Sequence, residues 1–432
     1  MSENKPKTRN PWFWIPSLYY AQGIPYIVVM TVSVIMYKRL GISNTDIALY
    51  TSWLYLPWVL KPLWSPIVDI FGKKRNWIVI MQLLVGGGLA GVALTIPTSN
   101  FFQYTLAFFW LLAFNSSTHD IAADGFYMLG LSKHDQAWFV GIRNTFYRLS
   151  MITGQGLLVI VAGYLETETG DIPYSWMVTF FILTGLFILF FIYHKFILPY
   201  PVADVSARKD KSNSVFGEFL KTFKAFFKKK NIGVILGFIL LYRLGESQLV
   251  KLASPFLLDT RDIGGLGLST TELGIVYGTV GIICLTIGGI IGGFVVAKNG
   301  LKFWIWPMII AINLPDLVYV YLAYSQTTNF IIINLMVAIE QFGYGFGFTA
   351  YMLFLIYIAD GEYKTSHYAI ATGFMALGMM IPGMWSGWLQ ELIGYQHFFV
   401  WVCISTIPGF IITKFLKIDP EFGKKTEESE TK

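Results

Sequence analysis

Two aspartates, Asp120 and Asp124, stand four residues apart in an otherwise apolar stretch. Residues at this spacing share one face of a helix, where two like charges repel unless one takes a proton or a cation lies between them. The pair is therefore a candidate proton-coupling site. The alternative is that one carboxylate pairs permanently with an arginine while the other lies near water. Glu340, in a later apolar stretch, is a second proton candidate.

Cations that suit these carboxylates lie in nearby stretches. Arg143 and Arg148 carry planar guanidinium groups, which bind carboxylates or phosphates through two hydrogen bonds, so they fit an anionic solute as well as an aspartate partner. Lys61 precedes Pro62, which bends a helix and can turn the ammonium inward; the alternative is that the ammonium reaches toward the membrane interface. Each of these three cations is a candidate for binding solute.

Further polar residues are expected to line a binding cavity: Tyr19, Gln22, Tyr26, Asn144, Gln155, Arg243, Glu246, Gln341 and Tyr344. The first three follow helical spacing, so their rings and amide could contact a sugar face, or simply pack in the interior. Arg243 and Glu246 stand three residues apart, and they either contact solute or neutralise each other.

The composition indicates which kind of structure positions these residues. Of 432 residues, 55% are hydrophobic and 13% are charged, against roughly 45 to 50% and 25% in soluble domains. This excludes an ordinary soluble or disordered chain. A window of about 19 residues finds twelve apolar stretches, each long enough to cross about 30 Å of hydrocarbon. Charged side chains at that depth cost at least about 2.5 kcal/mol each, so each needs a partner, water or a function.

The apolar stretches divide the chain into two halves. The expected organisation is an N-terminal six-helix bundle (1–197), a cytoplasmic basic linker with an amphipathic helix (198–230), a C-terminal six-helix bundle (231–418) and a charged cytoplasmic tail (419–432). Basic residues concentrate in the loops on the side of both termini, and the opposite loops hold Lys38, Arg39 and Arg261. The positive-inside rule therefore predicts that both termini are cytoplasmic.

An internal repeat supports two equivalent halves. Leu40–Tyr50 (LGISNTDIALY) returns as Leu266–Tyr277 (LGLSTTELGIVY), and both copies open an apolar stretch on the same side. Parallel repeats of this kind place a cavity between the halves and permit alternating access. We therefore expect an all-α integral membrane protein with twelve transmembrane helices in two parallel six-helix repeats.

The segment Ser65–Arg75 (SPIVDIFGKKR) resembles the G-x-x-x-D-x-x-G-x-x-x-R/K signature of the major facilitator superfamily. Ser65 replaces the first glycine and Arg75 comes one place early. In the second half, Ala297 replaces the aspartate, so a charge-relay latch is expected to rest on the first copy. The residues expected to form this conformational latch are Asp69, Gly72, Lys73, Lys74 and Arg75.

Within that superfamily, three segments resemble the AmpG-type muropeptide permeases: Leu56–Trp77, Asp120–Tyr127 and His367–Trp388. Acetyl-CoA transporters share part of this pattern. The resemblance implies proton-driven symport of anhydro-muropeptides into the cytoplasm across a bacterial inner membrane, as part of peptidoglycan recycling.

Other functions stay open at this stage. The alternatives are a transporter of another anionic solute, such as an acidic sugar, a peptide or acetyl-CoA, a membrane acyltransferase using His119 with Asp120, and a non-transporting sensor. We expect no enzyme activity, no cofactor, no metal and no nucleic-acid partner. The expected partners are a small solute, protons and the lipid bilayer, with the chain acting as a monomer.

Overall fold

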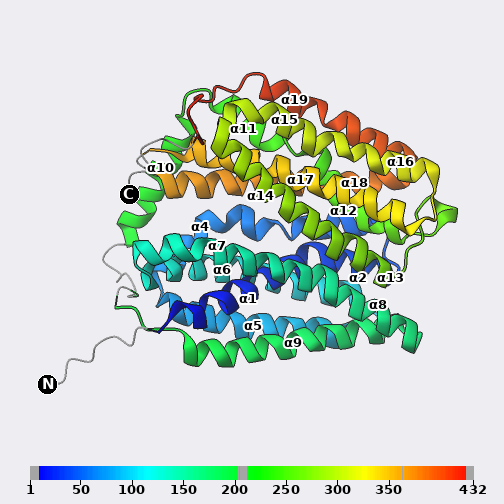
Figure 1. Ribbon diagram of the computed structural model, residues 1–432. Coiled ribbons are helices and arrows are strands. Elements are labelled where there is room, and N and C mark those ends of the chain that lie inside the picture. Colours follow the sequence, from blue (N-terminus) through cyan, green and yellow to red (C-terminus); the bar gives the residue numbers. More distant parts are fainter. Residues whose placement is uncertain (1–8, 203, 205–211, 362, 425–432) are drawn as a thin grey trace. The chain divides into compact units, whose positions relative to one another are not determined.

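The computed structural model describes residues 9–202, 204, 212–361 and 363–424 of the chain. The secondary structure of these residues is helical (Figure 1). Within them, nine helical segments are long and apolar enough to cross a membrane. The longest, Lys364–Thr413, contains two of the apolar stretches found in the sequence, divided at Gly394, whose φ of 75° interrupts the helix. The all-helical membrane architecture is thus confirmed, and the number twelve stays a prediction.

The contacts divide the chain into two compact units. Unit 1 consists of residues 1–40 and 60–219. Its helices are α1 (Ile15–Ile27), α2 (Ser33–Arg39), α5 (Lys74–Thr95), α6 (Phe101–Gly130), α7 (Lys133–Met151), α8 (Leu158–Thr169) and α9 (Ile172–Ile197), with most of α4 (Leu56–Ile70) and part of α10 (Ser212–Phe227). In this unit α5 packs on α6 and α9, and α1 packs on α7 (Figure 1).

Unit 2 consists of residues 41–59 and 220–432. Its helices are α3 (Asn44–Trp53), α11 (Ile232–Leu241), α12 (Leu244–Leu258), α13 (Thr270–Leu273), α14 (Ile282–Asn299), α15 (Leu301–Asn313), α16 (Leu317–Ser325), α17 (Phe330–Ala359), α18 (Lys364–Ser405) and α19 (Ile407–Thr413). Here α17 packs on α14 and α15, while α18 packs on α3 and α12. Gly288 and Gly345 allow the α14–α17 contact, because a side chain at either would meet backbone of the facing helix.

The segment that contains α3 is grouped by its contacts with unit 2. Residues 41–59 come early in the chain, yet their contacts assign them to unit 2. Two glycines of α18 explain the close approach of α3. A Cβ at Gly387 would lie 1.9 Å from the carbonyl oxygen of Asn44, and one at Gly383 would lie 2.7 Å from Ser52 Oγ. Because Gly383 and Gly387 have no side chains, α3 can pack closely against α18 at these two positions.

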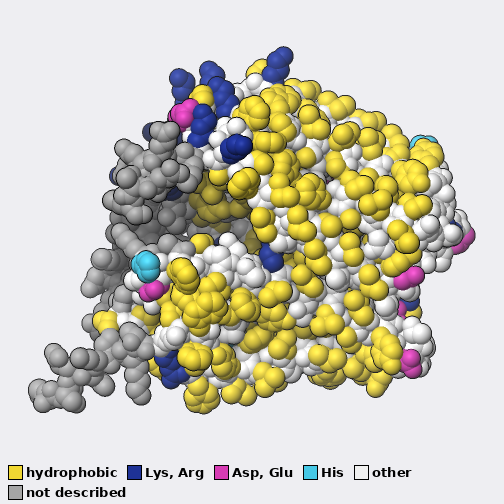
Figure 2. All heavy atoms as spheres, viewed as in Figure 1, with side chains coloured by type: hydrophobic (Ala, Val, Ile, Leu, Met, Phe, Trp, Pro, Cys, Tyr) yellow, Lys and Arg dark blue, Asp and Glu magenta, His cyan; other side chains and the backbone are white. Residues whose placement is uncertain are grey.

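The outward helix faces are apolar. On α14, exposed hydrophobic residues follow one another at helical spacing: Ile283, Ile287, Ile290 and Phe294. On α9, Leu189, Ile192 and Phe196 do the same. Figure 2 shows hydrophobic side chains over much of the viewed face of each unit, with most of the charged ones at the ends of the helices. Such extended apolar surface is what lipid contact requires.

The two copies of the internal repeat begin with the same cap. The Ser43 side chain accepts a hydrogen bond from the backbone N–H of Asp46, and Ser269 does the same with Glu272. In the second copy the Glu272 carboxylate also accepts from the backbone N–H of Ser269, which completes a capping box. The Glu272 carboxylate therefore caps its helix, whereas the Asp46 carboxylate accepts a hydrogen bond from the Ser43 hydroxyl. Both caps belong to unit 2.

Candidate functional site

In unit 1, each aspartate of α6 has its own cation. Lys61 Nζ on α4 lies 3.6 Å from Asp120 Oδ2, and Arg143 Nη2 on α7 lies 3.3 Å from Asp124 Oδ1. The side chains are partly exposed, with fractions of 29% and 15% in the first pair and 27% and 40% in the second. The two like charges that the sequence places on one helix face are thus compensated separately, each by an internal ion pair. We call Lys61, Asp120, Asp124 and Arg143 the paired cluster.

Tyrosines hold the second pair in place. Tyr19 OH on α1 donates a hydrogen bond to Asp124 Oδ1 at 3.2 Å. The Arg143 guanidinium lies 4.5 Å from the centroid of the Tyr19 ring and 5.1 Å from that of Tyr127. A guanidinium between a carboxylate and aromatic faces is stabilised by both. Tyr19, a member of the polar stripe expected on the first helix, therefore contacts both charged residues of this pair.

The other residues predicted in unit 1 surround this cluster unevenly. Gln22 and Gln155 are buried, and Gln155 lies in a π-helical stretch, Ile152–Leu157, that joins α7 to α8. Tyr26 is half-buried, Asn144 is exposed, and Arg148 contacts Met151 Sδ at 3.9 Å. The structure therefore brings Tyr19, Lys61 and Arg143 to the aspartates.

The loop expected to form a latch makes contacts that the sequence did not indicate. Gly72 has a φ of 97°, which favours glycine at this turn. Asp204 accepts from the backbone N–H groups of Lys74 at 2.7 Å and Arg75 at 3.1 Å, so it caps α5. The Arg75 side chain donates to the carbonyl oxygens of Lys195 and Leu198. Lys73 is exposed, and the side chain of Asp69 lies outside the described part of the structure.

A buried chain of hydrogen bonds joins four helices of unit 1. Ser17 Oγ lies 2.9 Å from His194 Nε2, His194 Nδ1 lies 2.9 Å from Gln82 Oε1, and Gln82 Nε2 lies 3.1 Å from His119 Nε2. Because the Gln82 oxygen only accepts and its nitrogen only donates, His194 donates from Nδ1 and His119 accepts at Nε2. His119 thus contacts Gln82, while Asp120 pairs with Lys61. The two residues of the acyltransferase alternative have different partners.

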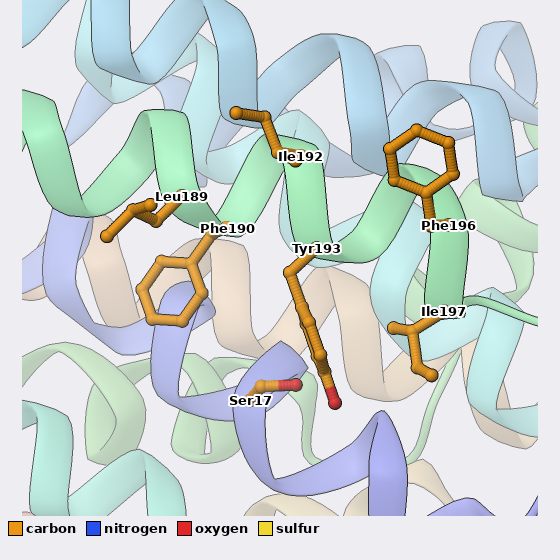
Figure 3. A pocket seen from close by; sticks show the side chains of 7 residues that line it. All are labelled: Ser17, Leu189, Phe190, Ile192, Tyr193, Phe196 and Ile197. Carbon is orange, nitrogen blue, oxygen red and sulfur yellow. The ribbon is translucent and has the colours of Figure 1, made fainter.

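An open apolar pocket of about 720 Å³ lies beside this chain, on the outer face of α9 (Figure 3). It is lined by Ser17, Leu189, Phe190, Ile192, Tyr193, Phe196 and Ile197. Ser17 comes from α1 and the others from α9. The lining includes no charged side chain, so this pocket is separate from the paired cluster.

In unit 2, Arg243 and Glu246 interact electrostatically without a hydrogen bond from Arg243 to either described carboxyl oxygen of Glu246. Arg243 lies at the break between α11 and α12, with a φ of −112° and a ψ of 25°, so the two residues lack regular helical spacing. Its guanidinium donates to Tyr344 OH and lies 4.8 Å from the centroid of Phe348. Glu246 is fully buried, and within the described structure neither carboxyl oxygen has a hydrogen-bond partner.

Two further carboxyl groups interact electrostatically with Glu246. They are Asp316, in the turn between α15 and α16, and Glu340, on α17. Asp316 is 1% and Glu340 2% exposed, and Gln341 Nε2 donates to Glu340 Oε2 at 3.0 Å. We call Glu246, Asp316 and Glu340 the acidic cluster. In the part of the chain that the structure describes, no group of three such side chains has the geometry of a metal site.

Contacts that sequence reasoning missed hold α3 on unit 2. Asn44 Nδ2 donates to Gln390 Oε1 at 2.6 Å and to Tyr395 OH at 2.8 Å, and it lies 3.4 Å from Asp259 Oδ2. Tyr395 OH donates to Asp259 Oδ2 at 2.6 Å. The repeat in the sequence identifies the segment that forms α3, but it does not indicate which helices α3 contacts. These contacts make one end of α3 a polar anchor in an apolar environment.

These features define a class of protein: a multi-pass helical membrane protein with charged residues buried in each of two units. The chain matches the Major Facilitator Superfamily over residues 19–382. It therefore belongs to that superfamily, and it is a secondary transporter of a small solute.

Proteins of known name resemble the chain over most of its length. It is 26% identical over 421 residues to a protein of Rickettsia conorii that is named AmpG 4, covering 94% of this chain and 96% of that protein. It is 24% identical over 407 residues to the anhydromuropeptide permease of Escherichia coli K12, covering 91% of this chain and 77% of the permease. The resemblance to AmpG-type permeases stated from the sequence is thus confirmed.

Solved structures share the fold. A nucleoside transporter, NupG (D323A mutant), matches with a TM-score of 0.71 and 15% identity, covering 93% of this chain and 99% of that one. A D-xylose-proton symporter matches with a TM-score of 0.70 and 11% identity, covering 96% and 99%. At these identities the likeness concerns the fold, and the major facilitator architecture predicted from the sequence is confirmed.

Proposed function

We propose that the chain imports anhydro-muropeptides by proton-coupled symport. The proposal is supported by relatives that match nearly the whole chain, one of which is named an anhydromuropeptide permease. Muropeptides carry sugar rings, which suit tyrosine faces, and peptide carboxylates, which suit arginine and lysine. The proposed location is a bacterial inner membrane, with both termini in the cytoplasm, and the proposed working form is a monomer.

The observation that carries the proposal is the pairing of two carboxylates with two cations on three helices of unit 1. In the ion-paired state, Lys61 and Arg143 are occupied by Asp120 and Asp124. A proton on either aspartate removes the negative charge and frees its cation for an anionic solute. Proton binding and solute binding then favour each other, which is the thermodynamic basis of symport.

The acidic cluster of unit 2 is the proposed second place for protons. Its three carboxyl groups are buried, and one of them, Glu246, interacts electrostatically with Arg243. Ionising all three at membrane depth would be costly, and a bound proton removes one of the negative charges. Glu340 therefore stays a proton-coupling candidate, together with Asp120 and Asp124.

The test is uptake of radiolabelled anhydro-muropeptide into proteoliposomes, with and without an inward proton gradient. The proposal requires accumulation that depends on the gradient and disappears with a protonophore. Vesicles containing the Asp120→Asn/Asp124→Asn protein serve as the control for binding without gradient-driven accumulation. If folded, correctly oriented protein gives no uptake, the muropeptide proposal is wrong, and acidic sugars, peptides and acyl-CoA are tested next in the same vesicles.

A further inference from the structure

Lys251 is a buried cation that the proposed coupling scheme does not use. It lies on α12 and is 2% exposed. Its ammonium donates to Thr51 Oγ1 at 2.9 Å and lies 5.2 Å from the centroid of the Tyr55 ring. Both partners belong to the segment 41–59. Within the described residues Lys251 forms no ion pair, so a group with three N–H donors has one hydroxyl and one aromatic face as partners.

This arrangement leaves the positive charge poorly compensated. A buried ammonium normally requires an anion, and a hydroxyl dipole with a ring quadrupole replaces only part of the lost hydration. In unit 2 the helix that covers Lys251 is α3, which is connected at both ends to unit 1. Movement of α3 away from α12 and α18 would uncover the ammonium and remove its hydrogen-bond partner at the same time.

A second polar group stays beside Lys251 when α3 is removed. Ser254 lies three residues further along α12, which places it on the same side of the helix. It is 1% exposed, and its hydroxyl has no hydrogen-bond partner within the described structure. The facing residue of α18, Gly383, presents no side chain: a Cβ there would lie 3.3 Å from Lys251 Cγ. A cation and a hydroxyl donor beside a side-chain-free backbone are well suited to a carboxylate.

We propose that Lys251 and Ser254 form a carboxylate-binding subsite of the transported solute, which α3 covers. Thr51 and the solute compete for the same ammonium, so docking of α3 and binding of the carboxylate exclude each other. This inference rests on the proposed transport function and adds to it the chemical group that unit 2 recognises. It also gives α3 a role beyond packing, because its departure exposes the subsite.

The first experiment compares two probes in counterflow, a labelled anhydro-muropeptide with free peptide carboxyl groups and the same compound with those groups amidated. Charged hydrogen bonds contribute enough that Lys251→Met should raise KM for the acid probe by at least about tenfold. KM for the amidated probe should stay nearly constant. Lys251→Arg, which keeps the charge, should retain the preference for the acid probe. An equal rise for both probes would show a merely structural role and overturn the inference.

The competition makes a second, opposite prediction. Thr51→Val removes the hydroxyl that holds Lys251 when α3 is docked, so it should favour the uncovered state and lower KM for the acid probe. Lys251→Met and Thr51→Val thus act in opposite directions, although they remove the same hydrogen bond. A rise in KM for Thr51→Val would contradict the competition. This variant also keeps the test decisive if Lys251→Met fails to fold.

A third experiment is independent of the solute. In a protein whose Cys284 and Cys403 are replaced by alanine, Ser254→Cys is labelled with two impermeant thiol reagents, one bearing a sulfonate and one a quaternary ammonium. Attraction by Lys251 should make the sulfonate reagent faster, and adding Lys251→Met should abolish that preference. If neither reagent reacts in the folded protein, the site never opens and the inference fails. If wild-type protein exchanges neither muropeptide, the proposed solute is wrong, and this labelling alone decides the subsite.

Discussion

Units 1 and 2 compensate their interior charges differently. In unit 1, both aspartates of α6 have a cation within 4 Å, and the four side chains are partly exposed. In unit 2, the acidic cluster is fully buried and Arg243 donates to a tyrosine, while Lys251 has no anion among the described residues. Similar helical scaffolds can therefore hold charge as ion pairs or as separate groups. Removing one member of an ion pair leaves its partner uncompensated and lowers stability, whereas a separate buried charge is stabilised when a ligand or a proton binds to it.

The largest expected effect is the loss of coupling in unit 1. Asp124→Asn cannot exchange a proton, so gradient-driven accumulation of anhydro-muropeptide should fall to the level of empty vesicles. Counterflow, which needs no net proton movement, should persist. Asp124→Glu is the matched control and should retain accumulation. Accumulation by Asp124→Asn at the wild-type level would exclude Asp124 as the coupling residue.

The next prediction concerns the contribution of the Lys61–Asp120 ion pair to the free energy of unfolding. Lys61→Met leaves a carboxylate that is 15% exposed without its cation. It should lower stability by about 1 to 3 kcal/mol, between the values for exposed and buried pairs. Adding Asp120→Asn should recover most of that loss. Thermal unfolding of the single and double variants completes a double-mutant cycle; additive losses would show that the pair contributes nothing.

Unit 2 should behave in the opposite way. Glu246→Gln replaces a buried carboxyl group, whose oxygens have no hydrogen-bond partner among the described residues, by a neutral group of the same shape. Stability should therefore change by less than about 1 kcal/mol or rise. Asp120→Asn, matched in chemistry but located in an ion pair, should be the more destabilising change. The same thermal unfolding assay compares them. A larger loss for Glu246→Gln would mean that its carboxylate is ionised and compensated by Arg243.

A local effect is expected at the polar anchor of α3. Asn44→Ala removes donors to Gln390 and Tyr395, at a net cost of about 1 to 2 kcal/mol. The loss should be local, so hydrogen exchange of the α3 amides should accelerate while that of α14 stays unchanged. Thr45→Ala, at the more exposed contact with Glu391, is the milder control. Uniform acceleration throughout unit 2 would contradict a local anchor.

A further small effect concerns the hydrogen-bond chain of unit 1. Ser17→Ala removes the donor to His194 Nε2 at the edge of the apolar pocket. A single neutral hydrogen bond contributes about 1 kcal/mol, so the unfolding temperature should fall slightly and transport should persist. Ser17→Thr keeps the hydroxyl and should behave like the wild type. Loss of transport in Ser17→Ala at normal stability would show that the chain has a direct function.

The fold was predictable because its signals are local or periodic. Apolar stretches of sufficient length predict membrane helices, and the repeated segments Leu40–Tyr50 and Leu266–Tyr277 predict matching halves. The partners of the charged residues were not predictable in the same way. Which cation faces Asp120 or Asp124 depends on how α4 and α7 pack on α6, and spacing along one helix does not contain that information.

Two other features could not be predicted from the sequence, for related reasons. Asp204 lies in a stretch that was expected to be a linker, yet it caps a helix 130 residues earlier in the chain. The sequence also does not indicate that the segment 41–59 contacts α18 at two glycines, Gly383 and Gly387. Both depend on long-range contacts, which a single sequence does not reveal.

The docking of α3 has a further consequence, because α3 behaves as a ligand that is covalently tethered at both ends. Its binding to α12 and α18 is an intramolecular reaction, with an effective concentration of the order of millimolar or more for short tethers. Even a weak intrinsic affinity would therefore keep α3 docked most of the time, and a solute must compete with a partner that never diffuses away. Lengthening the connection at Gly41 by inserted glycines should lower that effective concentration and shift the balance toward the undocked state, without altering a single contact in the docked one.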